Sequence, residues 1–381
     1  MREEQSKILK RFHKDTTTLK AHHWKYFLDL YQGCAHSCAY CLYRQGRKFS
    51  RGIPVPGITA DCLAEELDNA QPAGITYLGA TSDIYQPIEK GLVLVRPILS
   101  VFCEKRLPIV LATKSLLIRR DIDLLSRLAL DGLVEVSITI ITLDDRFAKL
   151  LEPGAPSPSE RLELVRELTS HDIPVSFHVA PCIPGYFSEA GVREFVYALH
   201  ETGAIGAYSC ILGMRRAYKD SLLKRIGTVD KGLANYLVKI YDHTETPNAV
   251  PPFAQIVLAE MERFSQVCAA CGFEFYCEHL PSLDTNTRTG GIFRFKLPTI
   301  GDIYRNFIDR GKQEVQLSDL EDYLVNFPSV DEAYRSLVVR LWRSGTLFQD
   351  TYLAPIDIKP CERYAIADSV QLTVSEVMTC D

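Results

Sequence analysis

Three cysteines, Cys34, Cys38 and Cys41, have the spacing of a metal-binding loop, with three residues between the first pair and two between the second. Thiolates are soft ligands that suit iron–sulfur clusters or zinc. A four-iron cluster held by three cysteines keeps one iron open to a small molecule. Zinc needs a fourth ligand, and His36 is poorly spaced for that role. The triad therefore favours a catalytic [4Fe-4S] cluster over a structural metal site.

A second set of cysteines, Cys268, Cys271 and Cys277, is separated by two and five residues and could hold an auxiliary metal. However, Cys268 and Cys271 also continue a helically spaced apolar stripe with Met261 and Phe264, which predicts burial in a core. The sequence leaves both interpretations open.

The elements that must position the first loop are short apolar runs alternating with segments of helical periodicity. Strands are expected at 26–31, 75–79, 109–113, 134–141, 175–180 and 207–213, and helices at 61–69, 88–105, 121–131, 159–171 and 189–202. Six β-then-α repeats imply parallel strands with right-handed crossovers, and hence an α/β fold. Periodicity alone leaves a doubly wound sheet and a partial barrel open.

The pattern changes near residue 215. Helices are expected at 220–242, 255–271, 317–327 and 330–347, with a strand at 273–276. We therefore divide the chain into a basic N-terminal segment at 1–25, a β/α domain at 26–214 and a mainly helical C-terminal region at 215–381 that would recognise the substrate.

Composition and charge set broad limits on the class of protein. The chain has 381 residues, is 46% hydrophobic and contains 12 cysteines. It has no apolar run long enough for a transmembrane helix and begins without a secretory signal, so we expect a cytoplasmic protein that does not contact membranes. The first 60 residues hold eleven Lys or Arg and four Asp or Glu. This local excess of positive charge modestly favours an anionic partner such as a nucleic acid.

The cysteine loop resembles the signature of the radical S-adenosylmethionine (SAM) superfamily, including an aromatic residue, Tyr40, before the last cysteine. The resemblance implies a partial (β/α)6 TIM-type barrel. It also implies a [4Fe-4S] cluster whose open iron binds SAM, an electron donor of flavodoxin or ferredoxin type, and radical chemistry on a substrate. The spacing of Cys268, Cys271 and Cys277 is similar to the start of the auxiliary-cluster motif of peptide-modifying members, although Pro281 stands where the next cysteine belongs.

A narrower resemblance covers residues 24–214 and concerns the spore photoproduct lyase and "DNA repair photolyase"-like group. It is carried by the segments 80–84, 83–89, 111–115, 136–139, 151–156 and 180–185, which mostly fall at predicted strand ends. By position, the resemblance implies that Tyr40, Ser82, Lys114 and Ser137 contact SAM. An ammonium such as that of Lys114 pairs well with the SAM carboxylate in a partly dry pocket.

Two departures from that group argue against the activity of a spore photoproduct lyase. Ala80 replaces a cysteine that returns a hydrogen atom to the product, and Leu42 replaces a tyrosine after the last cluster ligand. Neither side chain can relay a hydrogen atom. Cys182 is a candidate replacement donor, although a buried core thiol is the more common role.

The sequence indicates less about substrate recognition than about the fold or the cysteine loop. Asp83, Arg215 and Arg216 follow predicted strands and are candidate substrate contacts. We expect a radical SAM enzyme acting on a nucleic acid or nucleotide-like substrate. The alternatives are the same chemistry on a peptide or small metabolite, with an auxiliary cluster, and a non-catalytic structural metal protein.

Overall fold

The structure is a computed structural model. It describes residues 8–11, 24–43, 51–69, 75–242, 252–277, 306–307, 310–312, 314–325, 332–343, 353–355 and 363–366. Most of the predicted basic segment at 1–25 falls outside these ranges. No helix in the described part of the chain is long and apolar enough to cross a membrane.

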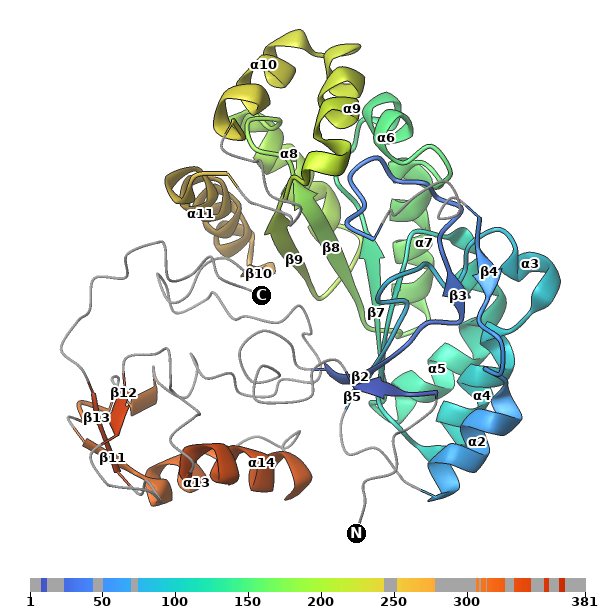
Figure 1. Ribbon diagram of the computed structural model, residues 1–381, viewed down its shortest axis with the longest axis vertical. Coiled ribbons are helices and arrows are strands. Elements are labelled where there is room, and N and C mark those ends of the chain that lie inside the picture. Colours follow the sequence, from blue (N-terminus) through green and yellow to red (C-terminus); the bar gives the residue numbers. More distant parts are fainter. Residues whose placement is uncertain are drawn as a thin grey trace.

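Eight strands form one open sheet in the order β1-β2-β5-β6-β7-β8-β9-β10 (Figure 1). The pairing of β1 with β2 is antiparallel and every other pairing is parallel. The strands are β1 (Lys10–Arg11), β2 (Trp24–Leu28), β5 (Ile75–Leu78), β6 (Ile109–Thr113), β7 (Val134–Thr139), β8 (Val175–Cys182), β9 (Gly206–Ile211) and β10 (Glu274–Cys277). The predicted α/β class and all six parallel strands are confirmed. The strand expected at 273–276 forms as β10, and it extends this sheet beyond the boundary predicted at residue 214.

Helices follow most of the strands and cover the outer face of the sheet (Figure 1). They are α2 (Ala60–Asn69), α3 (Glu89–Leu92), α4 (Val95–Lys105), α5 (Ile122–Leu130), α6 (Asp145–Leu151), α7 (Pro158–Ser170) and α8 (Glu189–His200), with a 3-10 helix η2 (Leu116–Asp121). Helix α7 begins at a capping box in which Ser157 and Glu160 satisfy each other's backbone N–H groups.

The single helix predicted at 88–105 is wrong, because the chain breaks between α3 and α4. Val93 adopts a left-handed conformation with φ of 51°. The buried carboxylate of Glu89 then accepts hydrogen bonds from the backbone N–H groups of Leu94 and Val95. These contacts satisfy the unpaired donors at the start of α4 and stabilise the break. Helix α6 was not predicted.

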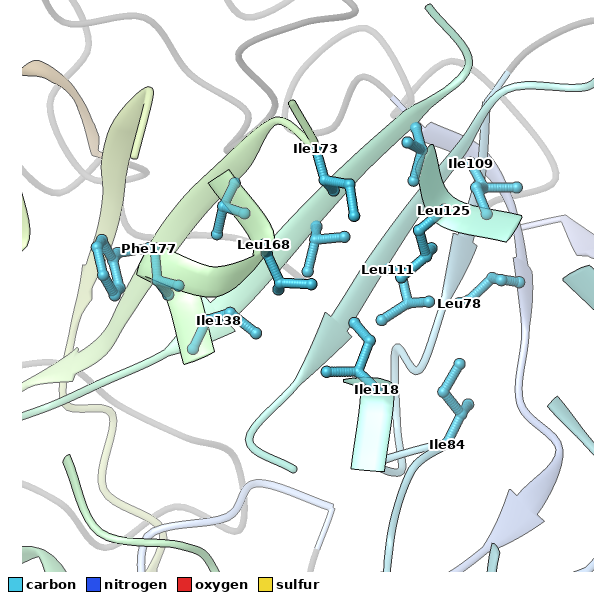
Figure 2. Close-up of a cluster of buried hydrophobic side chains, with 14 of the residues drawn as sticks. Leu78, Ile84, Ile109, Leu111, Ile118, Leu125, Ile138, Leu168, Ile173 and Phe177 are labelled. Carbon is cyan, nitrogen blue, oxygen red and sulfur yellow. The ribbon is translucent and has the colours of Figure 1, made fainter. Parts of the chain in front are cut away.

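Alternation along the strands separates the core from the site. Leu111, Ile138 and Phe177 point toward the helices and pack in the main hydrophobic cluster (Figure 2). Because successive strand residues face opposite sides, their neighbours face the inside of the barrel. Ala112, Thr139 and His178 accordingly line a cavity there.

Beyond the sixth strand, the predicted helix at 220–242 is two helices, α9 (Arg216–Gly227) and α10 (Lys231–Ile240). Asp230 caps α10 by accepting a hydrogen bond from the N–H of Leu233. The two helices pack on the cysteine loop in a second cluster that includes Cys38 and Tyr40. They therefore cover the outer side of that loop.

The rest of the C-terminal region combines helices and short strands. Helix α11 (Ala254–Cys271) precedes β10 and packs against α8. A three-stranded antiparallel sheet contains β11 (Glu314–Gln316), β13 (Arg363–Ile366) and β12 (Leu353–Pro355), accompanied by α13 (Leu317–Val325) and α14 (Glu332–Arg343). The helices predicted at 255–271, 317–327 and 330–347 are confirmed in position. A further pair, β3 (Tyr31–Gln32) and β4 (Ile53–Pro54), flanks the cysteine loop.

Candidate active site

A cavity of about 240 Å³ opens at the carboxyl ends of the barrel strands, where barrel enzymes build their sites. Cys34, Cys38 and Cys41 all line it. Opposite them, Lys114 and Thr139 contribute from the ends of β6 and β7. The cavity therefore brings together the three predicted cluster ligands and a predicted SAM contact.

Side chains from the segment after β5 hold the first half of the cysteine loop. The amide of Gln86 accepts a hydrogen bond from the N–H of Ala35 at 2.9 Å and donates to the carbonyl of Gly33 at 3.2 Å. His36 is 2% exposed, and its Nε2 lies 2.9 Å from Asp83 Oδ2. The loop is thereby fixed by buried polar groups on a neighbouring strand end.

The segment after α6 holds the second half of the loop through its backbone. Gly154 N–H donates to the carbonyl of His36 at 3.0 Å, and the N–H of Ala39 donates to the carbonyl of Leu151 at 2.7 Å. His36 Nδ1 lies 2.9 Å from the Gly154 carbonyl oxygen. A Cβ atom at position 154 would lie 2.3 Å from the Ala35 carbonyl oxygen, so glycine is required for this close approach.

The three thiols are a suitable donor set for a cluster. Burial is the main reason that the pKa values of Cys34 and Cys38 are raised, to about 11 and about 12. The thiols therefore carry protons that metal binding would displace. No group of three His, Cys, Asp or Glu side chains within the described residues is arranged to hold a single metal ion. The support for a cluster comes instead from the shared cavity and from the fixed loop around it.

A buried ion pair lies behind the loop. Arg161 Nη2 and Glu152 Oε2 are 2.5 Å apart, and neither side chain is exposed. The other Glu152 oxygen accepts a hydrogen bond from the Tyr40 hydroxyl. Arg161 also donates to the carbonyl of Thr139 at 2.7 Å. Burial disfavours the charged form of Glu152, but Arg161, Lys114 and the hydrogen bonds lower its pKa overall.

Lys114 is the cation of the cavity. Its backbone N–H donates to Asp83 Oδ2 at 2.8 Å, and its Nζ lies 5.9 Å from the centroid of the Tyr40 ring. Its Nζ has no hydrogen bond to another described residue. Burial acts to lower the pKa of Lys114, but Cys38 and Glu152 more than offset burial and raise it. The ammonium is therefore charged and able to receive an anion.

The remaining predicted SAM and substrate residues occupy different positions. Ser82 lines the cavity and donates to the carbonyl of Tyr31 at 2.8 Å. Ser137 is buried on β7 and is not part of the cavity wall, whereas Thr139, two residues further along, is. Arg215 donates to the carbonyl of Leu42, and Arg216 is exposed on α9 outside the wall.

The carboxylate of Asp83, a candidate substrate contact, already binds other groups of the protein. Its carboxylate accepts from the Thr113 hydroxyl, the Tyr85 N–H and the Lys114 N–H, and it pairs with His36. Burial opposes its charge, but His36 and these hydrogen bonds lower the pKa of Asp83 to about 2. Asp83 therefore positions the loop and Lys114.

The departures from the photoproduct-lyase pattern lie in the cavity wall. Both Ala80 and Leu42 line it, so no cysteine or tyrosine faces the cavity at those two positions. Cys182 is 1% exposed in the hydrophobic core and outside the wall, which agrees with the core role. Cys210 lines the cavity instead.

The proposed auxiliary site is not supported. Cys268 is 1% exposed and packs in the main hydrophobic cluster, as the helical stripe predicts. Cys271 is partly buried, and its thiol bonds to the Cys268 carbonyl. The side chain of Cys277 lies outside the described residues.

His178 lines the cavity as an uncharged ring stacked on Tyr208, with the ring centroids 5.2 Å apart. Burial, and after it the charge of Lys114, lowers the pKa of His178 to about 3. The unfolded chain would bind the proton more readily, so His178 contributes stability above pH of about 6.5 that is lost as pH falls toward 3.

Replacing His178 with glutamine should therefore reduce the pH dependence of stability. The largest change in slope would be about 1.4 kcal/mol per pH unit, the limit for one proton. Urea unfolding of wild type and variant across this range measures the difference. If the free energy of unfolding changed equally with pH in both proteins, the pKa of His178 would be the same in the folded and unfolded states.

Comparison with known proteins agrees with this geometry. Residues 28–191 match the model of the Radical SAM superfamily. The match covers less than half of the chain and includes the cysteine loop. The fold of the chain is similar to that of spore photoproduct lyase. One such structure, with bound AdoMet and dinucleoside spore photoproduct, has a TM-score of 0.52 and 16% identity, covering 69% of this chain and 80% of that one.

Relatives in sequence are mostly uncharacterised. A Methanocaldococcus jannaschii protein is 32% identical over 164 residues, or 42% of this chain and 61% of that protein. A Mycobacterium tuberculosis protein is 28% identical over 214 residues, or 50% of this chain and 63% of that protein. A radical SAM Nalpha-GlyT isomerase of Pseudomonas phage M6 is 26% identical, over 45% of this chain and 35% of that protein. The chain therefore spans less than two thirds of each of these relatives.

Proposed function

We propose that the chain holds a [4Fe-4S] cluster with Cys34, Cys38 and Cys41 and binds SAM beside it. The observation that carries the proposal is the cavity itself, which unites three thiols with a charged, partly buried ammonium. Lys114 would hold the SAM carboxylate. Tyr40 would pack against the cysteine loop and Lys114. Thr139 would contact the nucleoside part of SAM in place of the expected Ser137.

The protein's own residues would position the reactants and exclude water. A cluster with SAM supplies a 5′-deoxyadenosyl radical when a flavodoxin- or ferredoxin-type donor provides one electron. The Gln86, Asp83 and Gly154 contacts keep the cysteine loop in one conformation. Helices α9 and α10 cover the loop with apolar side chains, which protects a reactive centre from solvent.

The substrate class that we propose is a nucleic acid or nucleotide. The similarly folded lyase structure contains a dinucleoside. The cavity here is lined by aromatic rings, including Tyr43, Tyr77 and the uncharged His178. Flat rings of this kind can stack on nucleobases. A base within a duplex would have to be extruded to reach the cavity.

We further propose that the reaction is not that of spore photoproduct lyase. With Ala80 and Leu42 in the wall, the product radical lacks the hydrogen donor and relay that the resemblance assigns to those positions. Peptide modification with an auxiliary cluster is less well supported, because Cys268 is part of the hydrophobic core.

The test is anaerobic reconstitution followed by measurement of 5′-deoxyadenosine formation with oligonucleotides and with unrelated peptides. Oligonucleotides should bind with an affinity that falls as salt rises and should stimulate nucleoside formation. Stimulation by peptides alone would contradict the proposed substrate class. Absence of SAM cleavage in cluster-loaded protein would contradict the proposed chemistry.

A further inference from the structure

The buried ion pair between Glu152 and Arg161 lies next to the cation of the cavity without contacting the cavity itself. We propose that Arg161 is a positioning residue. It occupies Glu152, so that the Lys114 ammonium remains available for the carboxylate of SAM. This inference rests on the assignment of Lys114 to SAM under the proposed function.

Both carboxylates near Lys114 already have their donors. Glu152 accepts from Arg161 through one oxygen and from the Tyr40 hydroxyl through the other. Asp83 is likewise satisfied by His36 and by backbone and hydroxyl donors. Among the residues that the structure describes, the Lys114 ammonium therefore has no nearby carboxylate that still needs a partner.

The charges lead to the same conclusion. Glu152 and Arg161 are fully buried and oppositely charged, so the pair adds no net charge beside Lys114. Lys114 Nζ lies 5.9 Å from the centroid of the Tyr40 ring, and the Tyr40 hydroxyl bonds to Glu152, so the ammonium and the ion pair contact the same side chain. In a site of low dielectric, a cation without an ion-pair partner among the described residues binds an anionic group strongly.

Arg161 is held in place independently of Lys114. It comes from α7, and its second amino group donates to the carbonyl of Thr139 at the end of β7. Without Arg161, the buried Glu152 carboxylate would lose its counter-charge, which is costly in a protein interior. Lys114, whose Nζ lies against the Tyr40 ring that bonds to Glu152, would turn toward Glu152 and away from SAM.

The experiment compares the binding of SAM with that of decarboxylated SAM, which lacks only the carboxylate. Equilibrium binding to cluster-loaded protein without reductant keeps turnover out of the measurement. Wild type should prefer SAM, and the part of that preference due to the charge-assisted contact with Lys114 should be roughly ten- to a hundredfold. Arg161→Met should lose most of that preference by weakening SAM alone. The double variant Glu152→Gln/Arg161→Met should restore it, because no competing carboxylate remains.

Two further variants separate the possible outcomes. Lys114→Met should lose at least as much of the preference as Arg161→Met, and if it keeps the wild-type preference, the assignment of Lys114 in the proposed function is wrong. If Lys114→Met loses the preference while folded Arg161→Met keeps it, the positioning role alone is overturned. Glu152→Gln tests the same idea even if Arg161→Met does not fold. It should keep the preference, and a loss there would indicate a structural role for the pair and overturn the inference.

Discussion

Replacing any one of Cys34, Cys38 and Cys41 with alanine should abolish cluster assembly and, with it, formation of 5′-deoxyadenosine from SAM. Each thiol lines the same cavity wall, and no other described cysteine lies on the same loop to substitute for it. Iron and sulfide per chain after anaerobic reconstitution should fall from about four of each to near zero, since a cubane needs all of its protein ligands. Iron and sulfide assays, with the visible spectrum of the cluster, measure the effect.

The matched control is Cys268→Ala combined with Cys271→Ala. Cys268 is buried in the core away from the cavity, so this variant should keep the full iron content. If wild type held about eight irons per chain and this control held about four, the result would support an auxiliary cluster. Full iron in a Cys38→Ala protein would contradict the ligand assignment.

Gly154→Ala should prevent the cysteine loop from adopting its observed conformation. The added Cβ would meet the carbonyl oxygen of Ala35 at 2.3 Å and the Cα of His36 at 2.8 Å, both of them backbone atoms that cannot rotate away. Overpacking of this kind costs about 1–3 kcal/mol. We expect a lower urea midpoint for the apoprotein and poor cluster incorporation, measured by chemical unfolding and iron analysis.

Gly91→Ala is the control for this substitution. Position 91 lies in α3, and an added Cβ there would meet nothing within 4 Å. Alanine is also the better helix former, so the control should be neutral or slightly stabilising. If both variants were equally stable and bound equal iron, the close approach of Gly154 to the loop would not matter for the site.

The apolar pattern of the sequence was sufficient to predict the strands, but it was insufficient to predict several helix boundaries. A buried parallel strand such as β6 is a continuous apolar run, and it is visible without tertiary information. The break between α3 and α4 is different. The apolar periodicity continues through it, and the break depends on Glu89, whose burial is decided by packing. The separation of α9 from α10 at Asp230 was missed for a similar reason.

The candidate site divides in the same way. The cysteine triad is a local motif, and Lys114 and Ser82 were assigned through the family resemblance, whose segments mostly fall at strand ends. Glu152 stood in a segment that carried the resemblance, but its residue type indicated no role. Gln86, His36 and Arg161 were not predicted as parts of the site. Gln86 lies in a segment that carried the resemblance, His36 in the cysteine loop and Arg161 in a predicted helix, but no pattern indicated their contacts with the loop or with Glu152.

The sequence by itself determined the α/β class, the spacing of the three cysteines and the resemblance to radical SAM proteins, which in turn implied the partial barrel. These depend on the order of residues along the chain, and residues 28–191 match the superfamily as expected. Only the tertiary structure decided that Thr139 rather than Ser137 faces the cavity, and that Arg161 is paired with Glu152. Strand register and helix packing set those contacts. They bring together side chains from separate elements whose distances are fixed only in the folded chain.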